Sequence, residues 1–199
     1  MVEAMPNFYN LIRAKKFSTS SDTAIEIGPS SSATPNFAID AGGKLKWSSG
    51  SATADTNLYR TAADTLKTDD SLVVAGTVDV QQIREKMNDN TVSTNVMTCD
   101  FSTGAIFYNT TTLSANFTVN ITNAPTDNGY ATSVTVIVNQ GSTGYYPNAL
   151  QIAGSSQTIK WSNGNTVPTP TANKIDFFTF TLIRRGSAWT VLGSYSLNF

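Results

Sequence analysis

Between residue 94 and the C-terminus the sequence repeatedly alternates apolar with polar residues, a pattern that favours β-strands over helices. In the clearest example, Phe178, Phe180 and Leu182 are separated by single threonines. Successive side chains of a strand point to opposite faces of a sheet, so these three residues share one face. The pattern therefore predicts a strand with one buried side, packed against a second layer.

Seven such stretches follow one another at a spacing typical of β-sandwiches. They are Thr98–Tyr108, Leu113–Thr122, Ser133–Asn139, Leu150–Ala153, Thr158–Trp161, Phe177–Arg184 and Trp189–Gly193. The sequence Arg185-Gly-Ser187 predicts the turn of the last hairpin. We expect residues 93–199 to form a C-terminal head with a β-sandwich or jelly-roll-like fold.

Residues 22–77 contain shorter strand candidates, each with only one to three large apolar residues. They are Thr23–Ile27, Asn36–Ile39, Lys44–Trp47, Asn57–Arg60, Thr65–Thr68 and Ser71–Val74. A single chain cannot build a core from so few apolar side chains, whereas three copies around a common axis can. This region is predicted to be a core-poor β shaft, and the protein an all-β homotrimer.

One segment has helical spacing. Val80, Ile83 and Met87 form a stripe at i, i+3 and i+7, which predicts a short helix over residues 78–90. We expect residues 78–92 to be a helical connector, either a simple linker or a three-helix junction between shaft and head.

The remaining leader, residues 1–21, mixes apolar and basic residues and suits docking onto another protein. The candidate docking residues are Phe8, Tyr9, Leu11, Ile12, Arg13, Lys15 and Lys16. The leader lacks the apolar core of a secretory signal, and no apolar run is long enough for a membrane helix. We therefore expect synthesis in a cytoplasm and no membrane insertion.

The charge content of the chain argues against one class of partner, nucleic acids. Charged residues make up 14% of the chain, against about 25% in typical globular proteins. The formal net charge is −1, and nucleic-acid binding needs a basic stripe that this sequence lacks. We expect no nucleic-acid partner.

The residue types needed for common catalytic and metal sites are largely missing. The chain has no histidine and one cysteine, Cys99, so the usual triads, zinc clusters and internal disulfides are excluded. Paired carboxylates, as in glycosidases, are the remaining enzymatic option, but adjacent residues such as Asp69 and Asp70 point to opposite faces of a strand. We expect no enzyme, no cofactor and no metal site.

A loop rich in tyrosine and amides is the candidate contact with a surface glycan. Its residues are Tyr145, Tyr146 and Asn148, which follow a Gly/Ser/Thr stretch. The structural alternative is that the two tyrosines cover the edge of the sandwich or pack between subunits. The three tryptophans are expected in the core.

Two parts of the sequence resemble virion proteins of tailed bacteriophages. Residues 41–74, with Asp55-Thr-Asn-Leu-Tyr-Arg60 and Leu66-Lys-Thr-Asp-Asp70 as the most specific blocks, look like a module of tail-fibre and minor tail proteins. Residues 157–199, with Ile159-Lys-Trp-Ser-Asn-Gly164 and Lys174-Ile-Asp-Phe-Phe-Thr-Phe180, are similar to the C-terminal domain of fibres from marine and cyanobacterial phages. The resemblance implies homotrimers with an N-terminal anchor, a β-rich shaft and an outward-facing head.

Three functions fit these observations. The first is a trimeric short tail fibre or spike-like appendage of a virion, with a distal head that contacts a host-surface glycan or protein. The second is a capsid decoration or head-fibre protein docked on the capsid shell. The third, from another class, is a glycan depolymerase, which would release reducing sugar from host polysaccharide.

Overall fold

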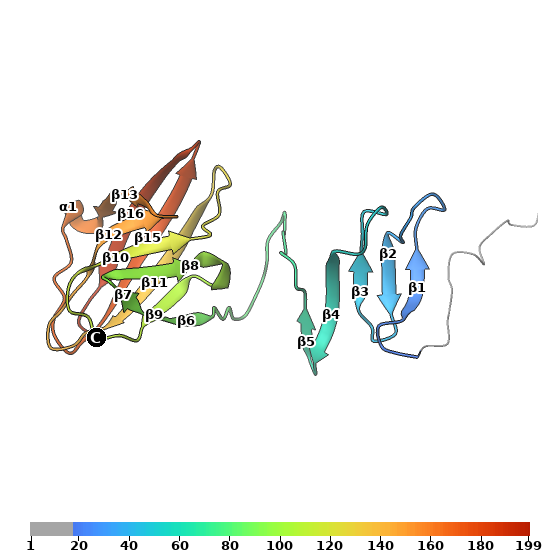
Figure 1. The fold of residues 1–199 in the computed structure, drawn as a ribbon, viewed down its shortest axis with the longest axis horizontal. Helices are drawn as coiled ribbons and strands as arrows, with labels where there is room; N and C mark the ends of the chain where they lie inside the picture. Colours follow the sequence, from blue (N-terminus) through green and yellow to red (C-terminus); the bar gives the residue numbers. More distant parts are fainter. Residues whose placement is uncertain (1–17) are drawn as a thin grey trace, which may run out of the picture. The chain divides into compact units, whose positions relative to one another are not determined.

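Strands account for nearly all regular structure in residues 18–199, the part of the chain that the computed structural model describes (Figure 1). The all-β fold class is confirmed. The chain divides into two compact units between Asp79 and Val80.

The first unit is a five-stranded antiparallel meander in which each strand pairs with the next along the chain. Its strands are β1 (Thr23–Ile27), β2 (Phe37–Asp40), β3 (Leu45–Trp47), β4 (Thr56–Ala62) and β5 (Thr65–Lys67). The first five predicted strands of this region are therefore present, with ends that differ by one or two residues.

The register of this sheet places its large apolar residues on one face. Ile25, Ile39, Leu45 and Leu58 are successive cross-strand partners, and Ile27, Phe37 and Trp47 form a second row beside them. Within residues 18–79, Ala38 is the only fully buried apolar residue, and Trp47 is 39% exposed. The sheet is thus a single layer, and residues 18–79 form no second layer over its apolar face.

The other face of the sheet carries most of the charges, and Arg60, which shares a face with Leu58, is the exception. Asp40 on β2 accepts a hydrogen bond from Lys44 N–H at 2.8 Å and pairs with Lys46 Nζ at 3.1 Å. Burial alone would raise the pKa of Asp40, but the Lys44 hydrogen bond and the Lys46 ion pair outweigh burial and lower it. The ionised carboxylate is therefore part of the folded sheet.

Asp40 should make the protein sensitive to acid. Because its folded pKa lies below its unfolded value of about 3.9, its contribution is complete above that pH and is lost as the pH falls further. Asp40→Asn should lower the free energy of unfolding by roughly 1–2 kcal/mol at pH 7 and by less at pH 3, below the unfolded pKa. Urea unfolding of both proteins, followed by tryptophan fluorescence, measures the difference; an equal difference at both pH values would contradict this account.

Two sequence predictions fail between the units. Ser71–Val74 form no strand, and the helix predicted over residues 78–90 is absent: residues 68–86 have no helix or strand, and Met87–Asn90 form strand β6. Among the described residues the apolar stripe of the expected helix has little to pack on, since Val80 and Ile83 are 55% and 75% exposed. A helix of that length is not stable without such packing.

The second unit contains two sheets packed on each other. One sheet has the order β13-β12-β10-β8-β7 and the other β14-β16-β15-β11-β9-β6. The strands after β6 are β7 (Val92–Ser93), β8 (Val96–Asp100), β9 (Ile106–Asn109), β10 (Phe117–Thr122), β11 (Ala131–Asn139), β12 (Pro147–Ile152), β13 (Ser155–Gln157), β14 (Ile159–Trp161), β15 (Ile175–Arg185) and β16 (Ala188–Ser196). We call this unit, residues 80–199, the head.

One continuous core lies between the two sheets of the head. One sheet contributes alternate residues of β8 and β10, such as Met97 and Val119, to this core. The other sheet contributes Phe178, Phe180 and Leu182 of β15, and all five side chains are fully buried. The alternation of apolar and polar residues in the sequence thus matches the alternation of buried and less buried residues along these strands of a sandwich-like fold. Several pairs are parallel, however, including β10 with both β8 and β12, which the alternation could not predict.

The strand predicted over Thr98–Tyr108 is divided between the two sheets. A 3-10 turn, Phe101–Thr103, separates β8 from β9, and the Asp100 carboxylate accepts a hydrogen bond from Ser102 N–H at its start. Hydrogen bonds from Ser102 and Asn123 lower the pKa of Asp100. The chain therefore crosses from one layer to the other through a capped turn.

The only helix in the described residues is a four-residue turn, α1 (Ser162–Asn165). Asn163 and Gly164 have φ values of 53° and 71°, in the left-handed region that asparagine and glycine tolerate best. No helix in residues 18–199 is long and apolar enough to cross a membrane.

Cys99 lies in the core of the head with no exposed surface, and burial raises the pKa of its thiol to about 12. Because the thiolate is the reactive form, we expect native protein to react with a thiol reagent such as DTNB at least about 100-fold more slowly than protein unfolded in urea. Rapid labelling of native protein would contradict the position of Cys99 in the core.

Candidate functional site

The structure gives the predicted tyrosine loop a structural role. Tyr145 and Tyr146 are partly buried and pack against the core of the head, while Asn148 is exposed on β12. The buried amide of Gln140 holds the loop, because it accepts a hydrogen bond from Tyr145 N–H at 2.9 Å and donates one to Tyr145 O at 2.7 Å. The cavity nearest to this loop in sequence has a volume of about 330 Å³ and is lined by residues 108–112 and 139–141. Neither tyrosine lines it.

The predicted docking residues cannot be placed. Phe8, Tyr9, Leu11, Ile12, Arg13, Lys15 and Lys16 lie outside the described residues. Their role stays a prediction.

A different part of the head combines aromatic and charged side chains. Arg184, near the end of β15, is the cross-strand partner of Trp189 on β16. Opposed residues on one face of a sheet lie side by side, and the guanidinium carbon of Arg184 is 4.8 Å from the centre of the Trp189 ring system. The Arg184 Nη1 group also donates to Ser187 O at 2.7 Å. Two contacts therefore fix the guanidinium.

The preceding loop is attached to the same hairpin. Gly129 N–H donates to Arg184 O at 2.9 Å, and Arg184 N–H donates to Tyr130 O at 3.0 Å. The Asn128 side chain accepts a hydrogen bond from Gly186 N–H at the hairpin turn. Residues 123–130 are thereby held over the end of β15.

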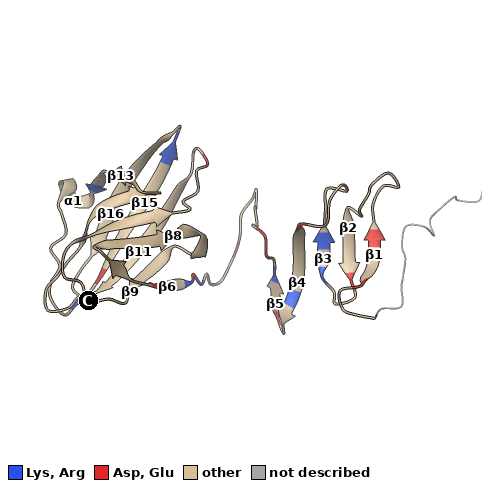
Figure 2. Ribbon diagram, in the orientation of Figure 1, with Lys and Arg blue, Asp and Glu red and all other residues tan. Residues whose placement is uncertain are grey.

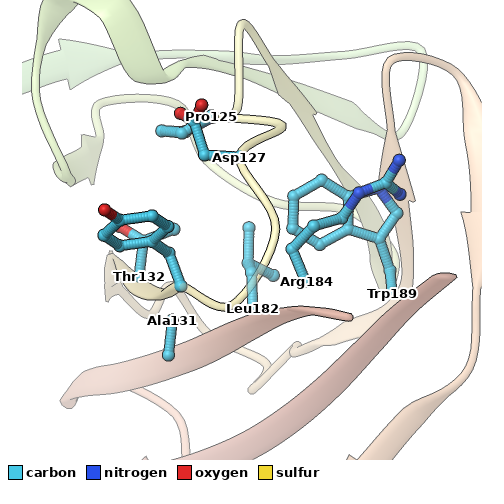
Figure 3. Close-up of a pocket in the computed structure, with 8 residues that line it drawn as sticks. Pro125, Asp127, Ala131, Thr132, Leu182, Arg184 and Trp189 are labelled. Carbon is cyan, nitrogen blue, oxygen red and sulfur yellow. The ribbon is translucent and has the colours of Figure 1, made fainter. Parts of the chain in front are cut away.

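A cavity of about 420 Å³ lies between this loop and the hairpin (Figure 3). Its walls include Arg184 stacked on Trp189, with Asp127 and Tyr130 contributed by the loop. A second cavity of about 570 Å³ shares Arg184 and Trp189 and is lined mainly by hydroxyl, amide and small apolar residues. We call the two cavities together the Arg184–Trp189 groove.

The guanidinium of Arg184 has more donors than the described residues satisfy. In residues 18–199 its only hydrogen-bond acceptor is Ser187 O, its Nε is buried without a partner, and no carboxylate forms a salt bridge with it. Figure 2 shows the strands of the head almost free of charge, with a basic tip on β15. The groove therefore contains a guanidinium that no carboxylate of the described residues pairs with, on a nearly uncharged domain.

The groove has features of a binding site. An aromatic ring, a fixed cation and several hydroxyls and amides can hold a polar ligand. No group of three or more histidine, cysteine, aspartate or glutamate side chains in the described residues could hold a metal ion.

No family model, no curated protein and no solved structure matches this chain.

The hairpin was the signal in the sequence that could have identified this groove. A two-residue turn at Gly186-Ser187 fixes the register of the flanking strands, which places Arg184 opposite Trp189. The contribution of the distant loop, residues 123–130, has no comparable signal.

Proposed function

We propose that this chain is a virion structural protein: a trimeric, short fibre- or spike-like appendage whose head binds the surface of a host. The resemblance of residues 41–74 and 157–199 to phage fibre proteins supports the proposal. So does the division into a one-layer sheet without its own core and a head with a complete one.

The single observation that carries the proposal is the uncovered apolar face of β1–β5. A sheet with one apolar face needs a second layer, because apolar side chains gain roughly 25 cal/mol for each Å² removed from water. The central residues of this face, Ile39, Leu45 and Leu58, are only partly buried. Contacts within residues 18–79 therefore bury only part of the apolar surface of these three side chains.

Identical copies of the chain are the partners that best fit this face. Apolar exposure continues beyond the sheet into residues 68–87, where Leu72 and Val73 are 79% and 89% exposed. A partner must therefore offer apolar surface along the same length of chain, and another copy aligned in parallel does so. Three sheets around one axis bury these faces together and leave the charged faces in water.

The head supplies the binding activity in this proposal. Its own core is closed, so it does not need partners to fold, and the Arg184–Trp189 groove is available to a ligand. A rigid sandwich that presents a groove on connecting loops is a common arrangement for recognition.

Sedimentation velocity of the full chain at micromolar concentration tests the assembly, with a trimer as the expected species. A stably folded monomer would overturn the proposal. Immunogold labelling of intact particles tests the location: label on an appendage supports the fibre, whereas label over the whole capsid shell would indicate a decoration protein instead.

A further inference from the structure

We infer that the Arg184–Trp189 groove binds an acidic polysaccharide and that Arg184 recognises the carboxylate of one of its sugars. This inference rests on the proposed role of the head in surface binding and adds the chemical class of the ligand. It stands on four features of the groove: the unpaired guanidinium, the aromatic walls, the acidic residue opposite and the two adjoining cavities.

The guanidinium favours an anion. Arg184 is held by Trp189 and Ser187 O but has no carboxylate partner in the described residues. Its planar fork of N–H donors matches the two oxygens of a carboxylate. A ligand carboxylate would therefore provide the counter-charge that the protein does not.

The aromatic walls favour a sugar over a small free anion. The Tyr130 side chain is 69% exposed and lines the same cavity as Trp189. One face of a pyranose ring presents C–H groups, which pack on an aromatic ring while the hydroxyls at the rim make hydrogen bonds. Tyr130 provides such a surface on the wall of the cavity, whereas the Trp189 ring holds the Arg184 guanidinium in place beside it.

Asp127 argues for a carboxylated sugar over a phosphate. Asp127 lines the same cavity as Arg184, so the two residues together carry no net charge. A doubly charged phosphate would be repelled by Asp127, whereas a singly charged sugar offers hydroxyl donors to it. A nucleic acid is disfavoured in addition because its backbone needs several basic residues.

The two cavities indicate a chain of sugars. The second cavity lies against the same Arg184–Trp189 pair and offers Asn123, Ser155 and Gln157 as polar walls. An acidic sugar bound at the pair would extend into both cavities, of about 420 and 570 Å³, each of a size typical of ligand sites. The ligand is thus an acidic sugar flanked by further sugars of the same chain.

Isothermal titration of the full chain with oligosaccharides tests the inference. The probes are hexuronate-containing and sialylated oligosaccharides, the same compounds after reduction of their carboxyl groups, and sulfated oligosaccharides. We expect binding of at least one carboxylated probe and at least about 10-fold weaker binding of its reduced form. Equal affinity for both forms, preference for sulfated probes, or no binding to any probe would overturn the inference.

Two variants connect that result to the groove. Arg184→Gln should weaken binding of the carboxylated probe at least about 10-fold, while Arg185→Gln, with the same loss of charge at the exposed neighbouring position, should not. Unchanged thermal unfolding of both variants shows that the fold is intact. Equal effects of the two substitutions would indicate general charge attraction and overturn the role of Arg184. Particle labelling and sedimentation test the appendage proposal independently of these outcomes.

Discussion

Leu45→Asp is expected to convert the assembled protein into smaller species at micromolar concentration. Leu45 lies on the central strand of the β1–β5 sheet, between Ile39 and Leu58 on its apolar face. In the proposed trimer each copy would place a carboxylate within an apolar interface, where an unpaired charge is strongly unfavourable. The dissociation constant should rise by about 100-fold or more, equivalent to about 2.7 kcal/mol.

Lys46→Gln is the matched control for that experiment. The substitution is at the next residue, changes the net charge by the same amount and lies on the opposite, charged face. It should leave the trimer intact. Circular dichroism of both variants monitors the fold. Equal sedimentation of Leu45→Asp and the unmodified protein would show that this face is not the assembly interface.

The second large effect is expected in the core of the head. Phe180 is fully buried on β15, with the Trp161 ring 5.8 Å away between ring centres. Trp161 in turn packs against Gly193, where a Cβ atom would lie only 2.6 Å from its ring. Phe180→Ala would leave a cavity beneath this tightly packed group and lower the free energy of unfolding by about 3–5 kcal/mol.

Thr181→Ala provides the comparison for this prediction. Thr181 is the next residue on β15 and its side chain points away from the core, with only a long contact of 3.5 Å to Ser133. It should change stability by less than about 1 kcal/mol. Urea unfolding curves of the two variants measure the difference. Similar losses for both would show that β15 does not have one buried and one outer face.

The sequence predicted the strands of this protein better than their arrangement. Alternation identified β15 correctly, because each second residue is buried in a single sandwich core. The same reasoning joined β8 and β9 into one strand, since a turn that crosses between layers leaves apolar residues on both sides of it. Parallel pairings such as β10 with β8 depend on contacts between distant residues, which local periodicity does not contain.

The predicted helix failed because local spacing does not show what a segment packs against. Val80, Ile83 and Met87 have helical spacing, but spacing stabilises a helix only when the stripe packs on something, and here it is exposed. Tyr145 and Tyr146, the candidate contacts with a glycan, pack partly on the core of the head, and their contact with a ligand stays a prediction. The Arg184–Trp189 pair was predictable from its hairpin, whereas the loop opposite it was not.

The order of strands in the six-stranded sheet affects how the chain folds as it is synthesised. β15 lies between β11 and β16, although β11 is made well before either of them. Until residues 175–196 are available, β11 has an unpaired edge and the core lacks Phe178, Phe180 and Leu182 of β15. Such edges promote aggregation, so a nascent or C-terminally truncated head needs protection from other chains. The β1–β5 meander, in contrast, pairs each new strand with the one just made.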